Sequence, residues 1–575
     1  MTKPNCVLGI HDGHNCGASL IIDGVVAASV NEERLSRSKN DVGYPRRAIE
    51  DVLAIASVDP GALDAVVYAS NFMHARSHLD DISRWYPVGL KEQKSDAARP
   101  RDYAGQLFEI RTAERIEEAV SHLGVPAERV SFVEHHLAHL AAAYYTAPNI
   151  APGQKALGLT CDGAGDNLCA TVSVCEGTRI DRISATDRHA SLGKIYSRLT
   201  YLMGMTPWEH EYKIMGMAPY ADPERAARAA EPLHQLLKLS DDKLGFALAG
   251  ELSTNYCYEF LRENFERVRF DTMAGAVQMF TEEMLVDWVR ACIAKTGITD
   301  LVCGGGVFMN VKANMHIAAL PEVTSMYVMP SAGDESLSIG AALHHFHQAA
   351  GSVDFSVSQL SNLYLGGDRA DEEGPAVAAA SNEPELTITR PDDMNIAIAE
   401  LLADGHVVAT CRGRMEWGAR SLGNRSILSP ANDFRRVDKI NSMIKMRDFW
   451  MPFAPSILDH AADEYFADPK GIAPQFMTFA FEAAKGRYED LTAASHPKDR
   501  TIRPQVVTEK ANPNYHATIA AYRERTGRGV VLNTSFNLHG EPIVYGAEDA
   551  LRVLRLSGLD HLALNDHLVS KVNVS

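Results

Sequence analysis

Three histidines at the start of an alanine-rich segment are suited to binding a metal ion. Residues 134–145 read E-H-H-L-A-H-L-A-A-A-Y-Y, and this run of helix formers predicts a helix. His135 and His139 stand four residues apart, so they lie on one helical face, where two imidazoles can share an ion. His136, three residues from His139, leaves a second pairing open. Ordinary packing of the three histidines is the alternative interpretation.

Carboxylates at the ends of two predicted strands can complete such a site. Asp162 follows the apolar stretch 156–160, and Asp334 follows the apolar stretch 326–329. A metal site needs oxygen ligands or open positions besides two imidazoles. We therefore predict that Asp162 and Asp334 join the histidine pair.

A run of three glycines and a nearby charged segment are candidates for nucleotide binding. Gly304–Gly306 follow a predicted strand at 301–303 and open a helix that contains Asn310. Backbone N–H groups at such a helix start can face a ribose or phosphate; the alternative is a tight turn from strand to helix. Lys213 follows Glu211 just ahead of a glycine bend, so it can meet a phosphate or remain solvated.

Residues 409–447 are basic in a chain that is acidic overall. They carry nine Lys or Arg against three Asp or Glu, whereas the whole chain has a net charge of −18. The excess indicates a bound anion, gripped at two points by guanidinium groups, or a solvated basic face. Lys445 and Arg447 are two residues apart, which predicts that both project to one side of a strand. The apolar strand 530–532 leads into 533–537, whose hydroxyl and amide groups can complete a phosphate cradle.

The elements that must position these residues form a repeated pattern. A predicted strand ending in His11-Asp12-Gly13 is followed by a hairpin, and a weaker copy ends in Asp162-Gly163 before a second hairpin. Two such halves are similar to the sugar-kinase, Hsp70 and actin class of nucleotide-binding domain. The strands are predicted at 6–10, 17–22, 25–30, 156–160, 170–174 and 179–184.

Length and composition predict two α/β domains. At 575 residues, the chain can form two cores, and 366–393 lacks an apolar period and predicts a link between them. The acidic balance disfavours broad binding of nucleic acid or anionic membrane. The nine cysteines include no C-x-x-C pair, and the start of the chain is too short for a signal peptide, so we expect a cytoplasmic protein. We expect no membrane span, because the sequence has no long apolar run.

Three motifs together resemble one enzyme family. They read G-R-M-E-W-G-A-R-S-L-G-N-R-S-I-L at 413–428, I-K-M-R-D-F-W-M-P-F-A-P-S-I-L at 444–458 and L-N-T-S-F-N-L-H-G-E-P-I-V at 532–544. The sequence thereby resembles the O-carbamoyltransferases of antibiotic biosynthesis and nodulation-factor decoration, over nearly the whole chain. The resemblance implies a Kae1-like domain at 1–365, a linker at 366–393 and a YrdC-like domain at 394–575.

The resemblance also implies a reaction. The YrdC-like half is expected to make carbamoyl-adenylate from carbamoyl phosphate and ATP, with Mg²⁺ accompanying ATP, and the Kae1-like half to pass the carbamoyl group to a small-molecule hydroxyl. It implies Fe²⁺, or another divalent metal, on His135, His139, Asp162 and Asp334, and it implies that His14 is the base for the acceptor. Other implied contacts are Glu211, Lys213, Gly304, Gly305 and Asn310 for the adenylate, Lys445, Arg447, Ser535 and Asn537 for ATP, and Arg420 and Arg503 for carbamoyl phosphate.

Three other functions stay open at this level. They are a tRNA threonylcarbamoyl-type transferase, a small-molecule kinase of the actin and Hsp70 class, and a non-catalytic nucleotide-binding regulator. The polar stretch from Tyr86 to Tyr103 can line an acceptor pocket or form a plain surface loop. The identity of the acceptor and the oligomeric state do not follow from the sequence.

Overall fold

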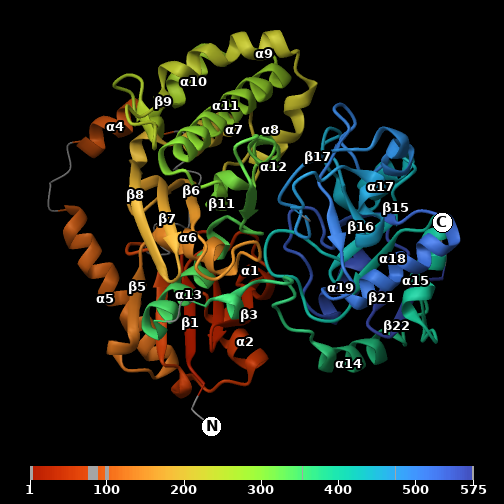
Figure 1. The fold of residues 1–575 in the computed structure, drawn as a ribbon. Coiled ribbons are helices and arrows are strands. Elements are labelled where there is room, and N and C mark those ends of the chain that lie inside the picture. Colours follow the sequence, from red (N-terminus) through yellow and green to blue (C-terminus); the bar gives the residue numbers. More distant parts are fainter. Residues whose placement is uncertain (1–3, 75–87, 98–102, 352–353, 473, 573–575) are drawn as a thin grey trace. The chain divides into compact units, whose positions relative to one another are not determined.

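The computed structural model describes residues 4–74, 88–97, 103–351, 354–472 and 474–572 (Figure 1). It divides into two compact units: unit 1 comprises the chain up to Glu32 together with Asn40–Leu360, and unit 2 comprises Glu33–Lys39 with Ser361–Ser575. The expected domain 1–365 therefore needs a correction, because 33–39 and 361–365 belong to unit 2. There, Arg37 donates hydrogen bonds to the Pro542 and Ile543 carbonyl oxygens at 2.9 and 2.8 Å.

Unit 1 contains two five-stranded sheets with equivalent topology. The strand orders are β3-β2-β1-β4-β5 and β8-β7-β6-β11-β12, and in each the hairpin strands are antiparallel while the last two run parallel to the central strand. The predicted duplicated α/β fold is therefore confirmed. The strands are β1 (Cys6–His11), β2 (Gly17–Ile22), β3 (Val25–Asn31), β4 (Ala65–Ala69), β5 (Val130–Val133), β6 (Ala156–Gly165), β7 (Leu168–Glu176), β8 (Arg179–Asp187), β11 (Asp300–Gly304) and β12 (Ser325–Val328).

Two helices pack between these sheets. α13 (Leu337–Ala350) packs on β1 and β2, α6 (His135–Thr146) packs on β6 and β11, and the two helices pack on each other (Figure 1). Their backbones approach so closely that a Cβ added to Gly340 would lie 1.8 Å from the Ala138 carbonyl oxygen. Because α6 follows β5 and α13 follows β12, the first turns of both helices lie next to strand ends.

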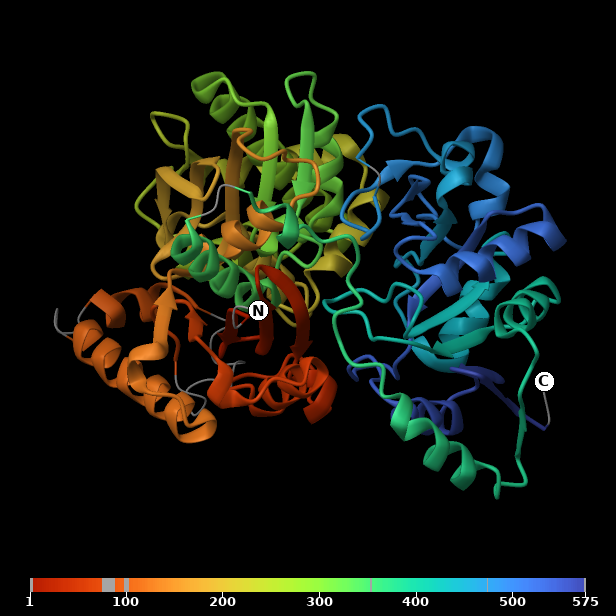
Figure 2. The same cartoon turned by 60° about the horizontal axis from the view of Figure 1, so that its bottom comes forward.

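The remaining helices of unit 1 are divided between the two halves of the duplicated fold. Figure 2 shows the first half, red to orange, and the second half, yellow to green, as separate lobes of this unit. Among the described residues, no helix is long and apolar enough to cross a membrane. The principal helices are α2 (Arg46–Ala56), α5 (Tyr103–Leu123), α7 (Leu192–Leu202), α8 (Glu211–Met217), α11 (Phe270–Thr296) and α12 (Val311–Ala318).

Unit 2 is built on an eight-stranded mixed sheet in the order β13-β22-β21-β14-β15-β20-β16-β19, with α15 (Met394–Ala403), α18 (Pro513–Thr526) and α19 (Ala547–Leu556) as its main helices. This confirms the predicted second α/β segment. The strands are β13 (Leu386–Thr389), β14 (Val408–Cys411), β15 (Ser426–Pro430), β16 (Ala454–Leu458), β19 (Gln505–Val507), β20 (Val530–Ser535), β21 (His561–Leu564) and β22 (His567–Lys571).

The expected linker at 366–393 is a folded part of unit 2 and does not join two domains. It contains α14 (Ala370–Ala380), which packs on α19, and β13, which pairs antiparallel with β22. β13 is the outermost strand of the sheet and its residues are alternately half-buried and exposed. An edge strand of this kind needs little apolar sequence, which is why its composition resembles a loop.

Candidate functional site

The four predicted metal ligands lie together in unit 1. His135 and His139 occupy the start of α6, Asp162 lies near the end of β6, and Asp334 stands three residues before α13. One ligand atom from each lies within 4.8 Å of the others. Asp162 Oδ2 is 3.4 Å from His135 Nε2, and Asp334 Oδ1 is 3.5 Å from His139 Nε2. Two imidazoles and two carboxylates thus converge on one point.

Hydroxyl groups orient the two imidazoles. Ser70 Oγ lies 2.9 Å from His135 Nδ1, and Ser336 Oγ lies 3.3 Å from His139 Nδ1. Both Nε2 atoms are buried, and neither has a hydrogen-bond partner among the described residues. Leaving such nitrogens without a partner is costly, and a hydrogen bond on the opposite ring nitrogen is the usual support for a metal-bound histidine. The residues therefore fit a divalent metal ion.

The charges of the cluster shift its pKa values in opposite directions. Burial lowers the pKa of His135, but the Asp162 and Asp334 carboxylates outweigh burial and raise it to about 9. Burial raises the pKa of both carboxyls, but the histidines outweigh it and lower the pKa of Asp334 and, more strongly, that of Asp162. Without a metal ion, the positive charge that the two carboxylates favour is therefore supplied by a proton on His135.

The structure selects His135 over His136 as the partner of His139. His136 Nδ1 lies 2.8 Å from Thr160 Oγ1, and burial lowers its pKa to about 3. His11, which the sequence analysis did not single out, borders the cluster instead. Its Nε2 atom lies 3.7 Å from Asp334 Oδ2 and 3.0 Å from the His14 carbonyl oxygen.

The glycine run packs against the cluster. A Cβ added to Gly304 would lie 2.7 Å from the His139 carbonyl oxygen, and one added to Gly305, where φ is +94°, would lie 2.4 Å from the Cys161 carbonyl oxygen. Gly306 N–H donates to Asp162 Oδ1 at 2.9 Å, while Asp162 Oδ2 faces His135. Close packing accounts for these glycines, and their nucleotide role stays a prediction.

The other residues predicted to hold the adenylate lie on neighbouring elements. The Asn310 amide pairs with the Gln278 amide at 2.9 and 3.0 Å, so it is engaged within the protein. Glu211 begins α8 and accepts a hydrogen bond from Trp208 N–H at 2.8 Å, and burial raises the pKa of Glu211. Lys213 is half-buried in the same helix.

His14 meets Trp208 from the first half of the unit. The two rings lie edge to face with their centroids 5.5 Å apart. The His14 backbone is tied to the metal-type cluster through His11, as described above. Trp208 thus links the predicted base with Glu211. Of the stretch from Tyr86 to Tyr103, residues 86–87 and 98–102 lie outside the described residues, so its acceptor role stays a prediction.

The predicted ATP residues of unit 2 form one polar cradle. Lys445 Nζ donates to Asn537 Oδ1 at 2.7 Å and to Ser535 Oγ at 3.1 Å. Arg447 Nη2 donates to Thr534 Oγ1 at 3.1 Å. The cradle therefore joins the K-x-R pair to the end of β20, as the two motifs suggested.

The pair is not on a strand, and that expectation is wrong. Residues 441–445 form a π-helical turn, and Met446 adopts a left-handed conformation with φ of +46° before Arg447. The reversal at Met446 brings both cations toward β20. Burial, with Arg447 and Lys39 nearby, keeps the pKa of Lys445 well below its usual range. An anionic ligand would favour the charged lysine here.

Several cations of the basic stretch 409–447 serve the fold. Arg425 is 1% exposed and donates to the Tyr545, Arg412 and Gly413 carbonyl oxygens. Arg414 donates to the Leu365 and Gly366 carbonyl oxygens. The local excess of positive charge thus overstated the number of cations suited to an anion.

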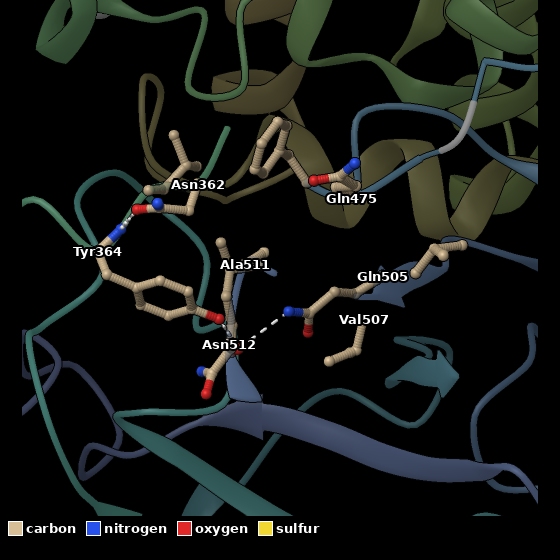
Figure 3. Close-up of a pocket in the computed structure, with 11 residues that line it drawn as sticks. Asn362, Tyr364, Gln475, Gln505, Val507, Ala511 and Asn512 are labelled. Atoms are coloured by element: carbon tan, nitrogen blue, oxygen red, sulfur yellow. Dashed lines mark hydrogen bonds between the residues drawn. The ribbon is translucent and has the colours of Figure 1, made fainter. Parts of the chain in front are cut away.

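Arg420 and Arg503 lie in segments that flank a small pocket of unit 2. Tyr364 Oη and Gln505 Nε2, which are both labelled in Figure 3, donate to the Leu422 carbonyl oxygen at 2.8 and 2.9 Å. These bonds hold the loop that follows Arg420, and Arg503 precedes Gln505 by two residues. The pocket is lined by residues 362–364, 422, 475–476, 505–507 and 511–512.

Comparison with known proteins identifies the family. The carbamoyltransferase N-terminus model matches residues 6–343, and the carbamoyltransferase C-terminus model matches residues 399–571. The chain belongs to the carbamoyltransferase family, which confirms the resemblance seen in the motifs and makes it an enzyme of carbamoyl transfer.

Three relatives match between 47% and 98% of this chain. The nodulation protein NolNO of Sinorhizobium fredii is 31% identical over 574 residues, 98% of this chain and 80% of that protein. Nodulation protein NolO of Bradyrhizobium diazoefficiens is 31% identical and covers 76% of this chain and 79% of its own length. The 3'-hydroxymethylcephem-O-carbamoyltransferase of Streptomyces clavuligerus is 28% identical over 274 residues, 47% of this chain and 48% of that enzyme.

Proposed function

We propose that this chain is an ATP-dependent O-carbamoyltransferase. In unit 2, water cleaves carbamoyl phosphate to carbamate and phosphate, and the carbamate oxygen attacks the α-phosphate of Mg²⁺-ATP, so that carbamoyl-adenylate forms and pyrophosphate leaves. Unit 1 then transfers the carbamoyl group to a hydroxyl of a small molecule. Family membership supports carbamoyl transfer, and the relative from Streptomyces clavuligerus supports an oxygen acceptor. The observation that carries the proposal is the set of two buried imidazoles and two half-buried carboxylates, in which two imidazole nitrogens lack a hydrogen-bond partner among the described residues.

His135, His139, Asp162 and Asp334 would hold Fe²⁺ or another divalent metal. Such an ion supplies Lewis-acid polarisation of an oxygen bound to it. Ser70 and Ser336 orient the imidazoles, and Gly306 N–H orients Asp162. These contacts give the site a fixed geometry before any ligand binds.

The chain's own residues provide the remaining functions. His14 takes the proton of the acceptor hydroxyl as its oxygen attacks the carbamoyl carbon, and AMP leaves with the electron pair of the broken C–O bond. Lys445, Arg447, Ser535 and Asn537 bind the phosphates of ATP in unit 2, where Lys445 is buried at 3% exposure. Arg420 and Arg503 bind carbamoyl phosphate.

One incubation tests the proposal. The full chain, reconstituted anaerobically with Fe²⁺, is given Mg²⁺-ATP and carbamoyl phosphate, and pyrophosphate, ADP and AMP are measured. We expect pyrophosphate, and a panel of hydroxylated metabolites followed by mass spectrometry should reveal a product heavier by one carbamoyl group. Absence of pyrophosphate would refute the adenylate route, and ADP in its place would support a kinase.

A further inference from the structure

Lys194 lies over the loop that carries Asp162. Ser191 caps α7 by accepting Lys194 N–H at 3.1 Å, and its hydroxyl donates to the Gly163 carbonyl oxygen at 2.7 Å. A Cβ added to Gly193 would lie 3.1 Å from the Asp162 carbonyl oxygen, so the first turn of α7 packs directly on this loop. A Cβ added to Gly163 would lie 3.7 Å from Lys194 Nζ, which places the ammonium group beside the glycine that follows the ligand.

The ammonium group of Lys194 has an aromatic neighbour. Its Nζ atom lies 5.2 Å from the centroid of the Trp208 ring, the same ring that contacts His14. No hydrogen bond or ion pair joins Nζ to any residue of the described ranges. Trp208 itself adopts a left-handed backbone conformation with φ of +66°, which is costly for a bulky residue and is common at functional sites. The Trp208 ring therefore contacts both His14, the predicted base, and the ammonium group of Lys194.

Charge balance indicates what this cation is for. Two carboxylates and two neutral imidazoles balance one divalent ion, so an incoming phosphate ester brings uncompensated negative charge. Two buried arginines of unit 1 are engaged within the protein: Arg115 pairs with Asp12 at 2.8 Å, and Arg198 donates to the Asn255 carbonyl oxygen at 3.4 Å. Lys194 is thus well placed to meet a phosphate near the Asp162 loop.

We propose that Lys194 binds the phosphate of the carbamoyl donor in unit 1 and stabilises AMP as it leaves. This inference rests on the proposed function. As the acceptor oxygen bonds to the carbamoyl carbon, the C–O bond to the phosphate breaks and AMP gains one negative charge. An ammonium group in a partly buried site stabilises that developing charge. Because the contact between Lys194 and the phosphate strengthens during the reaction, its loss should lower kcat as well as the binding of the carbamoyl donor.

The test compares Lys194→Met with Lys194→Arg and with Lys155→Met, an exposed lysine of the same unit that pairs with Glu176. Each full-length variant is assayed for pyrophosphate, carbamoylated acceptor and bound metal. We expect Lys194→Met to release pyrophosphate at the wild-type rate while product falls about 10- to 100-fold, the usual range for one hydrogen bond to a charged group. Lys194→Arg should recover part of the product, and Lys155→Met should match the wild type.

The outcomes separate this inference from its alternatives. A Lys194→Met enzyme with a wild-type ratio of product to pyrophosphate would overturn it. A change in bound metal with that ratio unchanged would also overturn it, and would show that the lysine only balances the acidic cluster. If Lys194→Met fails to fold, Lys194→Gln takes its place, because the amide keeps a polar side chain of similar length without the charge. A wild-type ratio of product to pyrophosphate in Lys194→Gln would overturn the inference. A wild-type protein that releases no pyrophosphate would instead refute the proposed function.

Discussion

Replacing His139 by alanine should separate the two half-reactions. The imidazole is fully buried and supplies one of the four ligand atoms. Its hydrogen-bond partner, Ser336 Oγ, also donates to the Gly333 carbonyl oxygen at 2.8 Å, so the hydroxyl stays bonded in the variant. The cost to folding is therefore mainly the cavity, about 2 kcal/mol. Loss of a ligand should weaken metal binding at least about 100-fold, or about 2.7 kcal/mol, because changes in supporting residues alone reach that size.

The assay has two readouts and a matched control. Metal is measured after dialysis against a weak chelator, and pyrophosphate and carbamoylated acceptor are followed in parallel. His347→Ala is the control, because His347 is also buried in unit 1 and bonds to a serine hydroxyl, Ser358 Oγ, at 2.9 Å. We expect His139→Ala to lose metal and product but keep pyrophosphate, and His347→Ala to lose only stability. A His139→Ala protein that binds metal normally and carbamoylates at the wild-type rate would refute the reasoning.

Two further predictions concern the lysines of the two units. Lys445→Met should reduce pyrophosphate release about 10- to 100-fold, because the buried Nζ atom is the donor to both Ser535 and Asn537. The control is Lys510→Met, since Lys510 is exposed. Equal rates of pyrophosphate release in the two variants would contradict the phosphate-binding role of the cradle. Carbamoyl transfer should fall above about pH 8, because burial and Arg198 lower the pKa of Lys194 to about 8 against the opposing charges of Asp162, Asp334 and Glu211. Above that pKa the lysine is neutral and loses the phosphate. The decline should vanish in Lys194→Arg, whose guanidinium stays protonated, and its persistence would contradict the assignment.

Features encoded by near neighbours were predictable from the sequence. The four-residue spacing of His135 and His139 places them on one face of α6, and that follows from helical geometry alone. The repeated strand and hairpin predicted the duplication because short apolar runs and the Asp-Gly and Glu-Gly turns act within a few residues. The motifs of unit 2 likewise indicated the carbamoyltransferase family before any fold was known.

Tertiary packing decided which side chains meet. The choice of His135 over His136 depends on Thr160 from β6, which engages His136, and on Ser70, which orients His135. The turn at Met446 and the edge strand β13 were mispredicted, since a left-handed residue and a half-exposed edge carry no clear local pattern. Lys194 carried no sequence signal at all. Its ammonium group is brought to the Asp162 loop because Gly193 lets α7 pack against that loop, and such an approach depends on residues far apart in the chain.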